Sequence, residues 1–175
     1  YTPAVLVDLD AAEQNLRRYA DEAKKHGKQI WPMLKTHKST EFAMAQMHAG
    51  ATGFLCGTLD EAEAMCRAGV KNLMYAYPVA TQDSIRRVIA LSQACSFIVR
   101  IDGLESAAAI DAQAAAAGVS VCYTIIVDSG LHRLGVKPEQ MTAFGQTMQQ
   151  FQHLTFKGIS THPGHVYGAA CKADL

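Results

Sequence analysis

The 175-residue sequence lacks several features that define whole classes of protein. No apolar run approaches the roughly 20 residues that a membrane-spanning helix needs, and no basic block is interleaved with aromatic side chains. Sixteen basic and sixteen acidic residues give zero formal charge, which leaves no electrostatic footprint for nucleic acid or an anionic membrane. At 49% hydrophobic and 18% charged, the chain can bury a core. We expect a soluble protein that acts on small molecules, with no nucleic-acid or membrane partner.

The sequence also lacks a CxxC pair and a secretory leader before Tyr1. Its five cysteines are odd in number and widely spaced, which favours a reducing, cytoplasmic location. Cys122 lies inside an apolar run and is predicted to be a small core side chain. Without metal-ligand spacing, no metal site is predicted within this chain.

A short apolar or β-branched run followed by an amphipathic, often Ala-rich stretch recurs along the chain, which is the βα pattern. The predicted strands are Ala4 to Leu9, Gln29 to Leu34, Gly53 to Cys56, Asn72 to Ala76, Ser96 to Ile101, Ser120 to Val127 and Phe156 to Ser160. The predicted helices are Ala11 to His26, Thr40 to His48, Leu59 to Arg67, Gln82 to Ala94, Leu104 to Ala117 and Glu139 to Phe151. Glycines 50, 69 and 118 fit the left-handed position after a helix.

Near-continuous apolar strands such as 121–127 predict a parallel sheet that is covered on both faces. Two architectures remain open, a (β/α)8 TIM barrel and an open doubly wound sheet. No GxGxxG follows the first predicted strand, and polar residues gather after strand ends at 35–38, 128–133 and 162–165. Convergence of several strand ends on one face favours the barrel.

A complete barrel takes on the order of 250 residues, whereas this sequence has 175 and begins with Tyr1. We therefore expect a partial barrel domain over residues 1–175, with about six barrel strands and one leading strand. The last barrel strands are expected to be absent from this chain.

Lys35 follows the apolar run Gln29 to Leu34 and opens the sequence Lys-Thr-His-Lys. A lysine held between a buried strand and a turn can be desolvated, which makes its amine nucleophilic towards an aldehyde. Lys35 is therefore a candidate for a Schiff base. The alternative is that Lys35 and Lys38 only solvate a strand-to-helix loop, and position by itself leaves this open.

Four stretches, in order, resemble the D-threonine aldolase and D-serine dehydratase family, which shares the alanine-racemase-type barrel and uses pyridoxal phosphate. They are residues 2–10, the Pro-x-x-Lys-Thr-His-Lys run ending at Lys38, residues 128–136 (Asp-Ser-Gly-Leu-His-Arg-Leu-Gly-Val) and residues 158–167 (Gly-Ile-Ser-Thr-His-Pro-Gly-His-Val-Tyr). The Lys-Thr-His-Lys run is the most specific of the four.

The resemblance implies cofactor-binding roles for four residues. Lys35 would carry the cofactor, Arg133 would reach its phenolic oxygen and keep it anionic, and His162 would lie against its ring. Tyr167 is a further cofactor-binding candidate that could meet phosphate or a substrate carboxylate, as could His37 and His165. Without the resemblance, Arg133 fits a surface ion pair with Asp128, and His162 fits a loop histidine bonded to backbone.

The resemblance also implies an activity. A D-amino acid with a β-hydroxyl would form an external aldimine and undergo retro-aldol cleavage or dehydration, with Lys35 as the catalytic base or proton shuttle. The alternatives are an amino-acid racemase, a non-catalytic pyridoxal phosphate carrier and an α/β scaffold without a cofactor. Family members carry a later β domain with a divalent metal site, whose ligands are not in this chain, and we expect a homodimer in the full-length protein.

Overall fold

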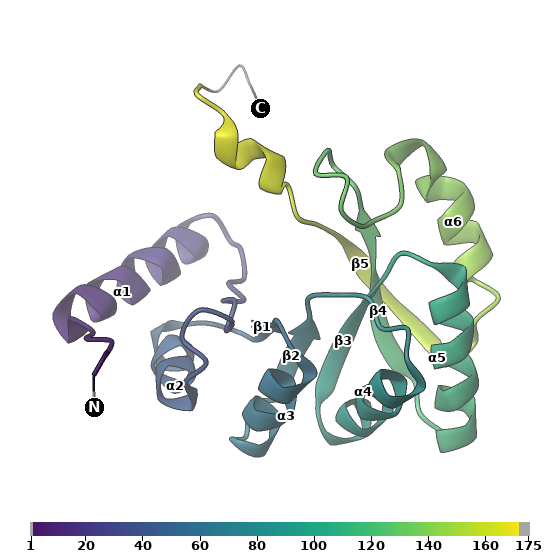
Figure 1. The fold of residues 1–175 in the computed structure, drawn as a ribbon, viewed down its shortest axis with the longest axis horizontal. Helices are drawn as coiled ribbons and strands as arrows, with labels where there is room; N and C mark the ends of the chain where they lie inside the picture. The colour runs from purple at the N-terminus through teal and green to yellow at the C-terminus, as the bar shows by residue number, and fades with distance from the viewer. Residues whose placement is uncertain (1, 172–175) are drawn as a thin grey trace.

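The computed structural model of the protein describes residues 2–171. Within this range five parallel strands form one sheet in the order β1-β2-β3-β4-β5 (Figure 1). The strands are β1 (Phe54–Cys56), β2 (Asn72–Tyr75), β3 (Ser96–Ile101), β4 (Val121–Val127) and β5 (Leu154–Thr161). The helices are α1 (Leu9–Lys25), α2 (Thr40–Ala49), α3 (Leu59–Arg67), α4 (Gln82–Ala94), α5 (Leu104–Ala117) and α6 (Met141–Met148), with 3-10 turns η1 (Pro138–Gln140) and η2 (Gly164–Gly168).

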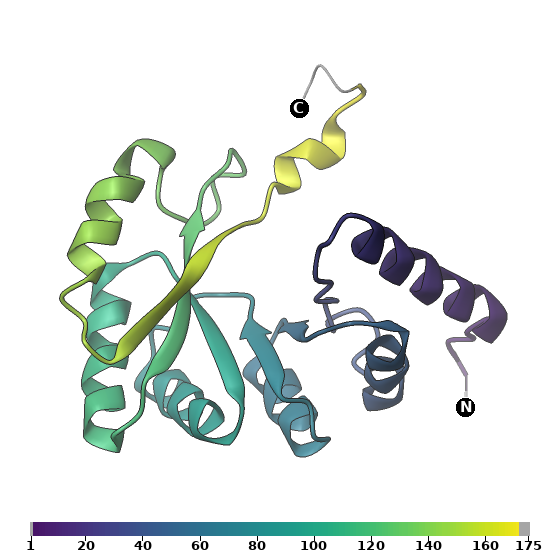
Figure 2. The same ribbon diagram turned by 180° about the vertical axis from the view of Figure 1, so that it is seen from behind.

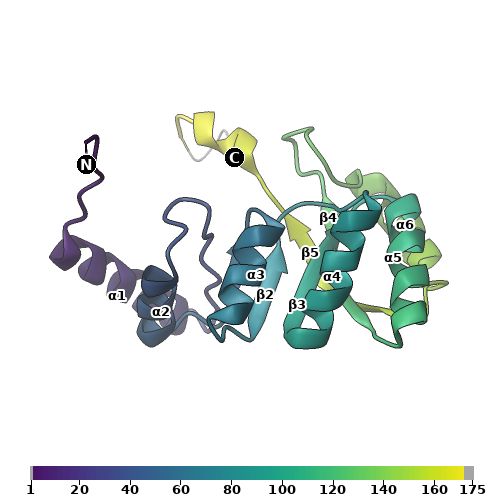
Figure 3. The same ribbon diagram turned by 60° about the horizontal axis from the view of Figure 1, so that its bottom comes forward.

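The strand order decides between the two predicted architectures. Every strand pairs in parallel with the next strand along the chain, whereas a doubly wound sheet reverses its order at a switch point and carries helices on both faces. Here α3 packs on α4 and α4 on α5, along one face of the sheet (Figure 3). In the view from behind, the strands lie in front of these helices, so the opposite face of the sheet is the one seen (Figure 2). The fold is therefore a segment of a TIM-barrel-type structure, and the doubly wound alternative is wrong.

The core lies between the sheet and these helices. Residues of β3 alternate between the two faces, and Phe97, Val99 and Ile101 are buried in the helix-side cluster. The other face, which would be a barrel's interior, contains half-buried side chains such as Ile98 and Cys122. Cys122 is thus less enclosed than its apolar run predicted.

The leading strand predicted at Ala4 to Leu9 is wrong for this structure. Residues 4–8 form no strand, and Val5 and Leu6 are 93% and 92% exposed. Helix α1 already begins at Leu9, because the Asp8 carboxylate accepts a hydrogen bond from the Ala11 N–H (3.0 Å) and caps it. A β-branched run without a partner strand has no ladder to join, so its sequence pattern is not sufficient to make it a strand.

The predicted strand Gln29 to Leu34 is reduced to a single parallel bridge between Met33 and Leu55. The segment still lies beside β1, since the Leu55 N–H donates to the Pro32 carbonyl (2.9 Å) and the Leu34 N–H donates to the Leu55 carbonyl (3.0 Å). Pro32 has no N–H and cannot extend the ladder. The described residues therefore form five sheet strands in place of the six barrel strands predicted.

The helix predictions hold, with one shortened. Five helices match within two residues, while the stretch predicted at Glu139 to Phe151 is divided into η1 and the shorter α6. Gly50 and Gly118 adopt left-handed φ values of 116° and 64° at the ends of α2 and α5, as the glycine pattern predicted. Across residues 2–171, no helix is both long and apolar enough to cross a membrane.

Candidate active site

Lys35 lies in a tight turn that directly follows the bridge at Met33. The Lys38 N–H closes the turn by donating to the Leu34 carbonyl (2.9 Å), and Leu34 is fully buried while Lys35 is exposed. Lys38 has a φ of 49°, in the left-handed region that non-glycine residues seldom adopt. The buried leucine and the closed turn place the Lys35 side chain at the carboxyl-terminal edge of the sheet.

Glu61 holds this turn from helix α3. Its carboxylate accepts hydrogen bonds from the Lys38 ammonium and from the backbone N–H of Gly57 (2.7 Å), and the residue is only 7% exposed. Burial by itself would raise the pKa of Glu61, but the bonds from Lys38 and Gly57 outweigh it, and the pKa is lowered. The pattern Thr58-x-x-Glu61 is a capping-box signal that could have drawn attention to it.

Gly57 leaves room for Lys35 at the end of β1. A Cβ atom placed on Gly57 would lie 3.2 Å from the Lys35 Cβ and 3.3 Å from Glu61 Oε2. The absence of a side chain here therefore allows the lysine turn to pack against the β1–α3 connection.

The loop after β4 is organised by Asp128. Its carboxylate accepts hydrogen bonds from the backbone N–H groups of Gly130 and His132 (both 3.0 Å) and bonds His132 Nδ1 (2.9 Å). The two backbone bonds and the His132 side chain lower the pKa of Asp128 to about 2. Farther along, the Gly135 N–H donates to Asp102 Oδ2 (2.9 Å), which ties the loop to the end of β3.

Arg133 does not pair with Asp128, so that alternative is wrong. The Asp128 carboxylate is occupied by His132, and no ion pair involves Arg133 within the described part of the chain. The Arg133 guanidinium carbon instead lies 5.8 Å from the ring centroid of Tyr77, a cation–π arrangement. Arg133 is exposed, so its donors are available to a ligand.

His162 follows β5 and is half-buried beside Arg133 in a small hollow at the loop after β4. Its ring makes no hydrogen bond to backbone within residues 2–171, in contrast to the loop-histidine alternative. Burial lowers the pKa of His162, and the positive charges of Arg133, Lys35 and Arg100 lower it further. The structure thus brings three cations near one imidazole, which disfavours its protonated form.

The remaining candidates, Tyr167, His165 and His37, lie around the Lys35, Arg133 and His162 side chains. Tyr167 in η2 is 80% exposed, with its ring centroid 6.0 Å from that of His162. His165 packs over Gly130, where an added Cβ would lie 3.2 Å from the imidazole. His37 accepts a hydrogen bond at Nδ1 from the Ser39 N–H (3.1 Å), so Nε2 carries the proton, and its ring turns towards Phe42.

Arg100 is the site residue that sequence reasoning missed. It lies on β3 and is 6% exposed, with Nε donating to Ser160 Oγ (2.9 Å) and Nη1 donating to the Ala76 carbonyl (3.0 Å). Its signal in the sequence is a charge within the apolar run 97–101. A charged side chain is seldom buried without a reason.

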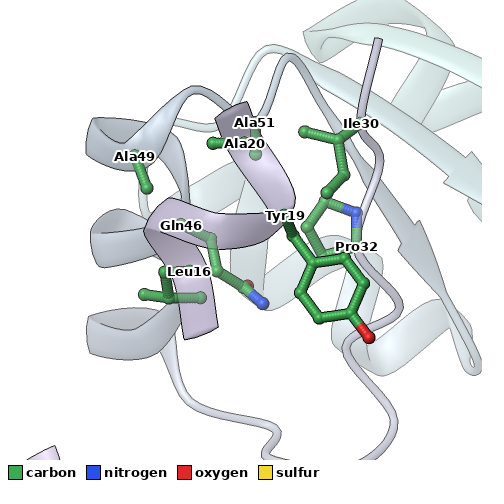
Figure 4. A pocket seen from close by; sticks show the side chains of 8 residues that line it. All are labelled: Leu16, Tyr19, Ala20, Ile30, Pro32, Gln46, Ala49 and Ala51. Atoms are coloured by element: carbon green, nitrogen blue, oxygen red, sulfur yellow. The ribbon is translucent and has the colours of Figure 1, made fainter. Parts of the chain in front are cut away.

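A separate apolar pocket lies between α1, α2 and the segment before Lys35 (Figure 4). Leu16, Tyr19 and Ala20 line it from α1, and Ile30 and Pro32 line it from the segment beside β1. It has no titratable group other than the Tyr19 phenol, and Lys35, Arg133 and His162 do not line it. This pocket is not the candidate site.

The side chains at the sheet edge fit an anionic aromatic aldehyde such as pyridoxal phosphate. Lys35 offers an exposed amine, Arg133 offers free donors for an anionic oxygen, and His162, whose pKa is lowered, offers a flat ring. The guanidinium of Arg100, whose buried Nη2 has no hydrogen-bond partner, adds a positive charge to the same region. Over residues 2–171, no group of three or more His, Cys, Asp or Glu side chains is arranged to hold a metal ion.

Polar side chains at the carboxyl ends of consecutive parallel strands characterise the (β/α)-barrel enzymes as a class. The family described as "Alanine racemase, N-terminal domain" matches residues 7–174. The chain therefore belongs to the alanine racemase N-terminal domain family, which is a family of pyridoxal-phosphate-dependent proteins. The family resemblance predicted from the sequence is confirmed.

Individual relatives are similar over nearly the whole chain. A 3-hydroxy-D-aspartate aldolase of Paracoccus denitrificans is 31% identical over 93% of this chain and 43% of its own length. A D-threo-3-hydroxyaspartate dehydratase of Delftia sp. is 31% identical over 95% of this chain and 44% of its own. The crystal structure of D-threonine aldolase from Filomicrobium marinum superposes with a TM-score of 0.87 at 31% identity, covering 91% of this chain and 43% of that one. The chain thus spans less than half the length of these relatives.

Proposed function

We propose that the protein containing this chain is a pyridoxal-phosphate-dependent lyase that acts on a D-amino acid with a β-hydroxyl group. The observation that carries the proposal is the position of Lys35, an exposed amine at the carboxyl edge of the sheet whose charge, like that of Arg133, lowers the pKa of His162. The names of the aldolase and dehydratase relatives support this substrate class over the racemases.

Each proposed residue has a physical task. Pyridoxal phosphate, when bound, supplies an electron sink for bond breaking at the α-carbon. Lys35 holds the cofactor by its amine and, once freed, accepts or delivers a proton. Arg133 donates to the phenolic oxygen and keeps it anionic. His162 packs against the ring, and Tyr167 closes the rim where phosphate or a substrate carboxylate would lie.

We further propose that the chain is a partial barrel domain of a longer protein. The relatives are more than twice its matched length. Remaining barrel strands would then close the barrel and bind the cofactor phosphate, and a β domain would follow with any divalent metal ligands. A homodimer is proposed for the full-length protein, and the D-amino acid is its small-molecule partner.

The Schiff-base assignment is tested by borohydride reduction. Adding pyridoxal phosphate to the full-length protein should give visible imine absorption, and reduction should attach the cofactor covalently to Lys35, as read by peptide mass spectrometry. Lys35→Ala should lose the reducible adduct. Lys137→Ala, at an exposed lysine before η1, is the matched control and should keep it. An adduct retained by Lys35→Ala overturns the assignment.

The reaction class is tested with defined substrates. The full-length protein with a divalent metal is incubated with D-threonine, D-serine and D-threo-3-hydroxyaspartate, and the products are identified. Glycine with an aldehyde indicates retro-aldol cleavage, and a keto acid with ammonia indicates dehydration. Turnover of alanine enantiomers only would favour a racemase, and bound cofactor without turnover of either isomer would favour a carrier.

A further inference from the structure

Arg100 is a buried positive charge that lacks a carboxylate partner. It is 6% exposed, and none of the ion pairs found in residues 2–171 includes it. Its hydrogen-bond partners are a serine hydroxyl and a backbone carbonyl, both uncharged. A buried charge normally requires a counter-charge, because removing a charge from water is unfavourable. Arg100 is therefore retained at a cost in stability, which needs an explanation.

The guanidinium spans the inner face of the sheet. From β3 it reaches Ser160 on β5 and the Ala76 carbonyl just after β2, and Ser160 Oγ lies 3.0 Å from Thr124 Oγ1 on β4. Hydrogen bonds thus connect the four consecutive strands β2, β3, β4 and β5 near their carboxyl ends. Ser160 is two residues before His162, so the two side chains share a strand face where β5 continues extended. Fixing Ser160 fixes the direction in which His162 leaves the strand.

One donor group of Arg100 is unused. Nη2 is buried without a hydrogen-bond partner, while Nε and Nη1 are both bonded. Asp102 is near enough for its charge to oppose the lowering of the Arg100 pKa, but it forms no ion pair with Arg100, and its Oδ2 accepts from the Gly135 N–H (2.9 Å). Arg133 is a second nearby cation, and the two repel, as the lowered pKa of Arg100 reflects after the larger effect of burial. The three cations Lys35, Arg100 and Arg133 outnumber the two carboxylates of this region, Asp102 and Asp128, and an anion would neutralise the excess positive charge.

We propose that Arg100 is a positioning residue of the Lys35 site, which orients the His162 end of β5 through Ser160 and supplies the buried positive charge that attracts an anionic ligand. The proposal rests on the function proposed above for the identity of that ligand, pyridoxal phosphate. Arg100 does not contact the reacting atoms, because its guanidinium is covered. Its effect is transmitted through Ser160 and through its electric field.

The first test needs no cofactor. The ring of His162 is titrated by NMR, with 13C-labelled histidine, in the full-length protein and in Arg100→Met, Arg100→Gln and Ser160→Ala. Removing a positive charge stabilises the protonated imidazole, so both neutral variants should raise the pKa of His162 by roughly half a unit, the order expected for one charge within about 10 Å. Ser160→Ala keeps the charge and should leave this pKa unchanged. The other charged or titratable groups facing His162 are Lys35, Arg133, Asp128 and Tyr167, and none is altered.

The second test measures affinity for pyridoxal phosphate by absorbance. Arg100→Met and Arg100→Gln should bind about 10-fold more weakly, the size expected for losing one charged interaction. Ser160→Ala should bind more weakly by a smaller factor, since it loses orientation but keeps the charge. Arg100→Lys should restore the His162 pKa but only part of the affinity, because a single flexible ammonium replaces the two fixed nitrogens, Nε and Nη1, that bond Ser160 and Ala76.

The outcomes separate the two proposals. If the wild-type protein binds no pyridoxal phosphate, the proposed function fails, while the cofactor-free titration still decides the electrostatic role of Arg100. If Arg100→Met does not fold, Arg100→Gln, which can still bond Ser160, is the neutral variant used. The contrary result is that the neutral variants lower the melting temperature and leave the His162 pKa and the cofactor affinity at their wild-type values. That result would show that Arg100 only stabilises the fold, and it would overturn the inference.

Discussion

Glu61 and Lys38 form an ion pair that connects helix α3 to the turn carrying Lys35. The two partners differ in environment, since the side chain of Glu61 is 7% exposed and that of Lys38 is 59% exposed. The same carboxylate accepts the Gly57 N–H at the end of β1. Glu61 therefore bonds both the turn that carries Lys35 and the β1–α3 connection beside that turn. This makes Glu61 a positioning residue for the proposed Schiff base.

Glu61→Gln should weaken this support while preserving shape. The glutamine can still accept from Gly57 but loses the charge that pairs with Lys38. We expect cofactor adduct formation at Lys35 to slow by about 10-fold, since a small displacement of a reacting group can lower rates by one to two orders of magnitude. The measurement is the rate of imine absorption after mixing full-length protein with pyridoxal phosphate.

Glu63→Gln is the matched control for this prediction. Glu63 lies on the same helix and pairs with Arg87 Nε at 2.6 Å, away from the Lys35 turn. This control should alter thermal stability without slowing adduct formation. Equal slowing in both variants would show that α3 acts only through general stability.

Gly57→Ala tests the close approach at the end of β1. The added methyl would lie 3.2 Å from the Lys35 Cβ and 3.3 Å from Glu61 Oε2, so the lysine turn must shift. We expect affinity for pyridoxal phosphate to fall several-fold, as read by absorbance titration. Gly145→Ala is the control, because nothing lies within 4 Å of its added Cβ in α6. It should keep the affinity and raise the free energy of unfolding by about 0.5–1 kcal/mol.

The sequence predicts the barrel units well because each helix and most strands carry a local signal. Two helices match their predicted bounds, α3 (Leu59–Arg67) and α5 (Leu104–Ala117). In both, the spacing of apolar residues and the signals for the helix ends indicate the same boundaries. Residues 4–9 do not match because a strand needs a partner, which local sequence does not supply.

Contacts between distant positions explain what the sequence could not predict at the site. Lys35, Arg133 and His162 are found from motifs, but Arg100 and Glu61 act through partners 60 and 23 residues away. No spacing rule reveals such a bond. Only a charge inside the apolar run 97–101, or a capping-box glutamate, marks these two residues as unusual.

Asp128 should make the loop after β4 sensitive to acid. Its pKa of about 2 lies below the ordinary aspartate value, so the stability it contributes is present above that ordinary value and is lost as pH falls through about 2. Thermal melts of wild type and Asp128→Asn should therefore differ most above about pH 5 and converge towards pH 2. Asp83→Asn, which removes an exposed carboxylate paired with Arg86, is the control and should change little. A gap between wild type and Asp128→Asn that is independent of pH would contradict the assignment.

Phe156 and Ile159 should govern the behaviour of the segment 1–175 when it is expressed by itself. They are 53% and 64% exposed on β5, and they pair with Tyr123 and Ile125, which are buried in the helix-side core. β5 is also an edge of the sheet as described, with unpaired backbone groups. Exposed edges with apolar side chains favour association.

We therefore expect the isolated segment to associate, and Phe156→Lys with Ile159→Lys to shift it towards monomer in equilibrium sedimentation. The control adds the same charge on exposed positions of the α6 region, as Thr142→Lys with Gln149→Lys, and should leave association in place. In the full-length protein the first pair should instead lower the melting temperature, because we propose that later barrel elements cover these side chains there. A monodisperse, cooperatively melting wild-type segment would contradict this prediction, because it would show that the exposed face of β5 needs no cover.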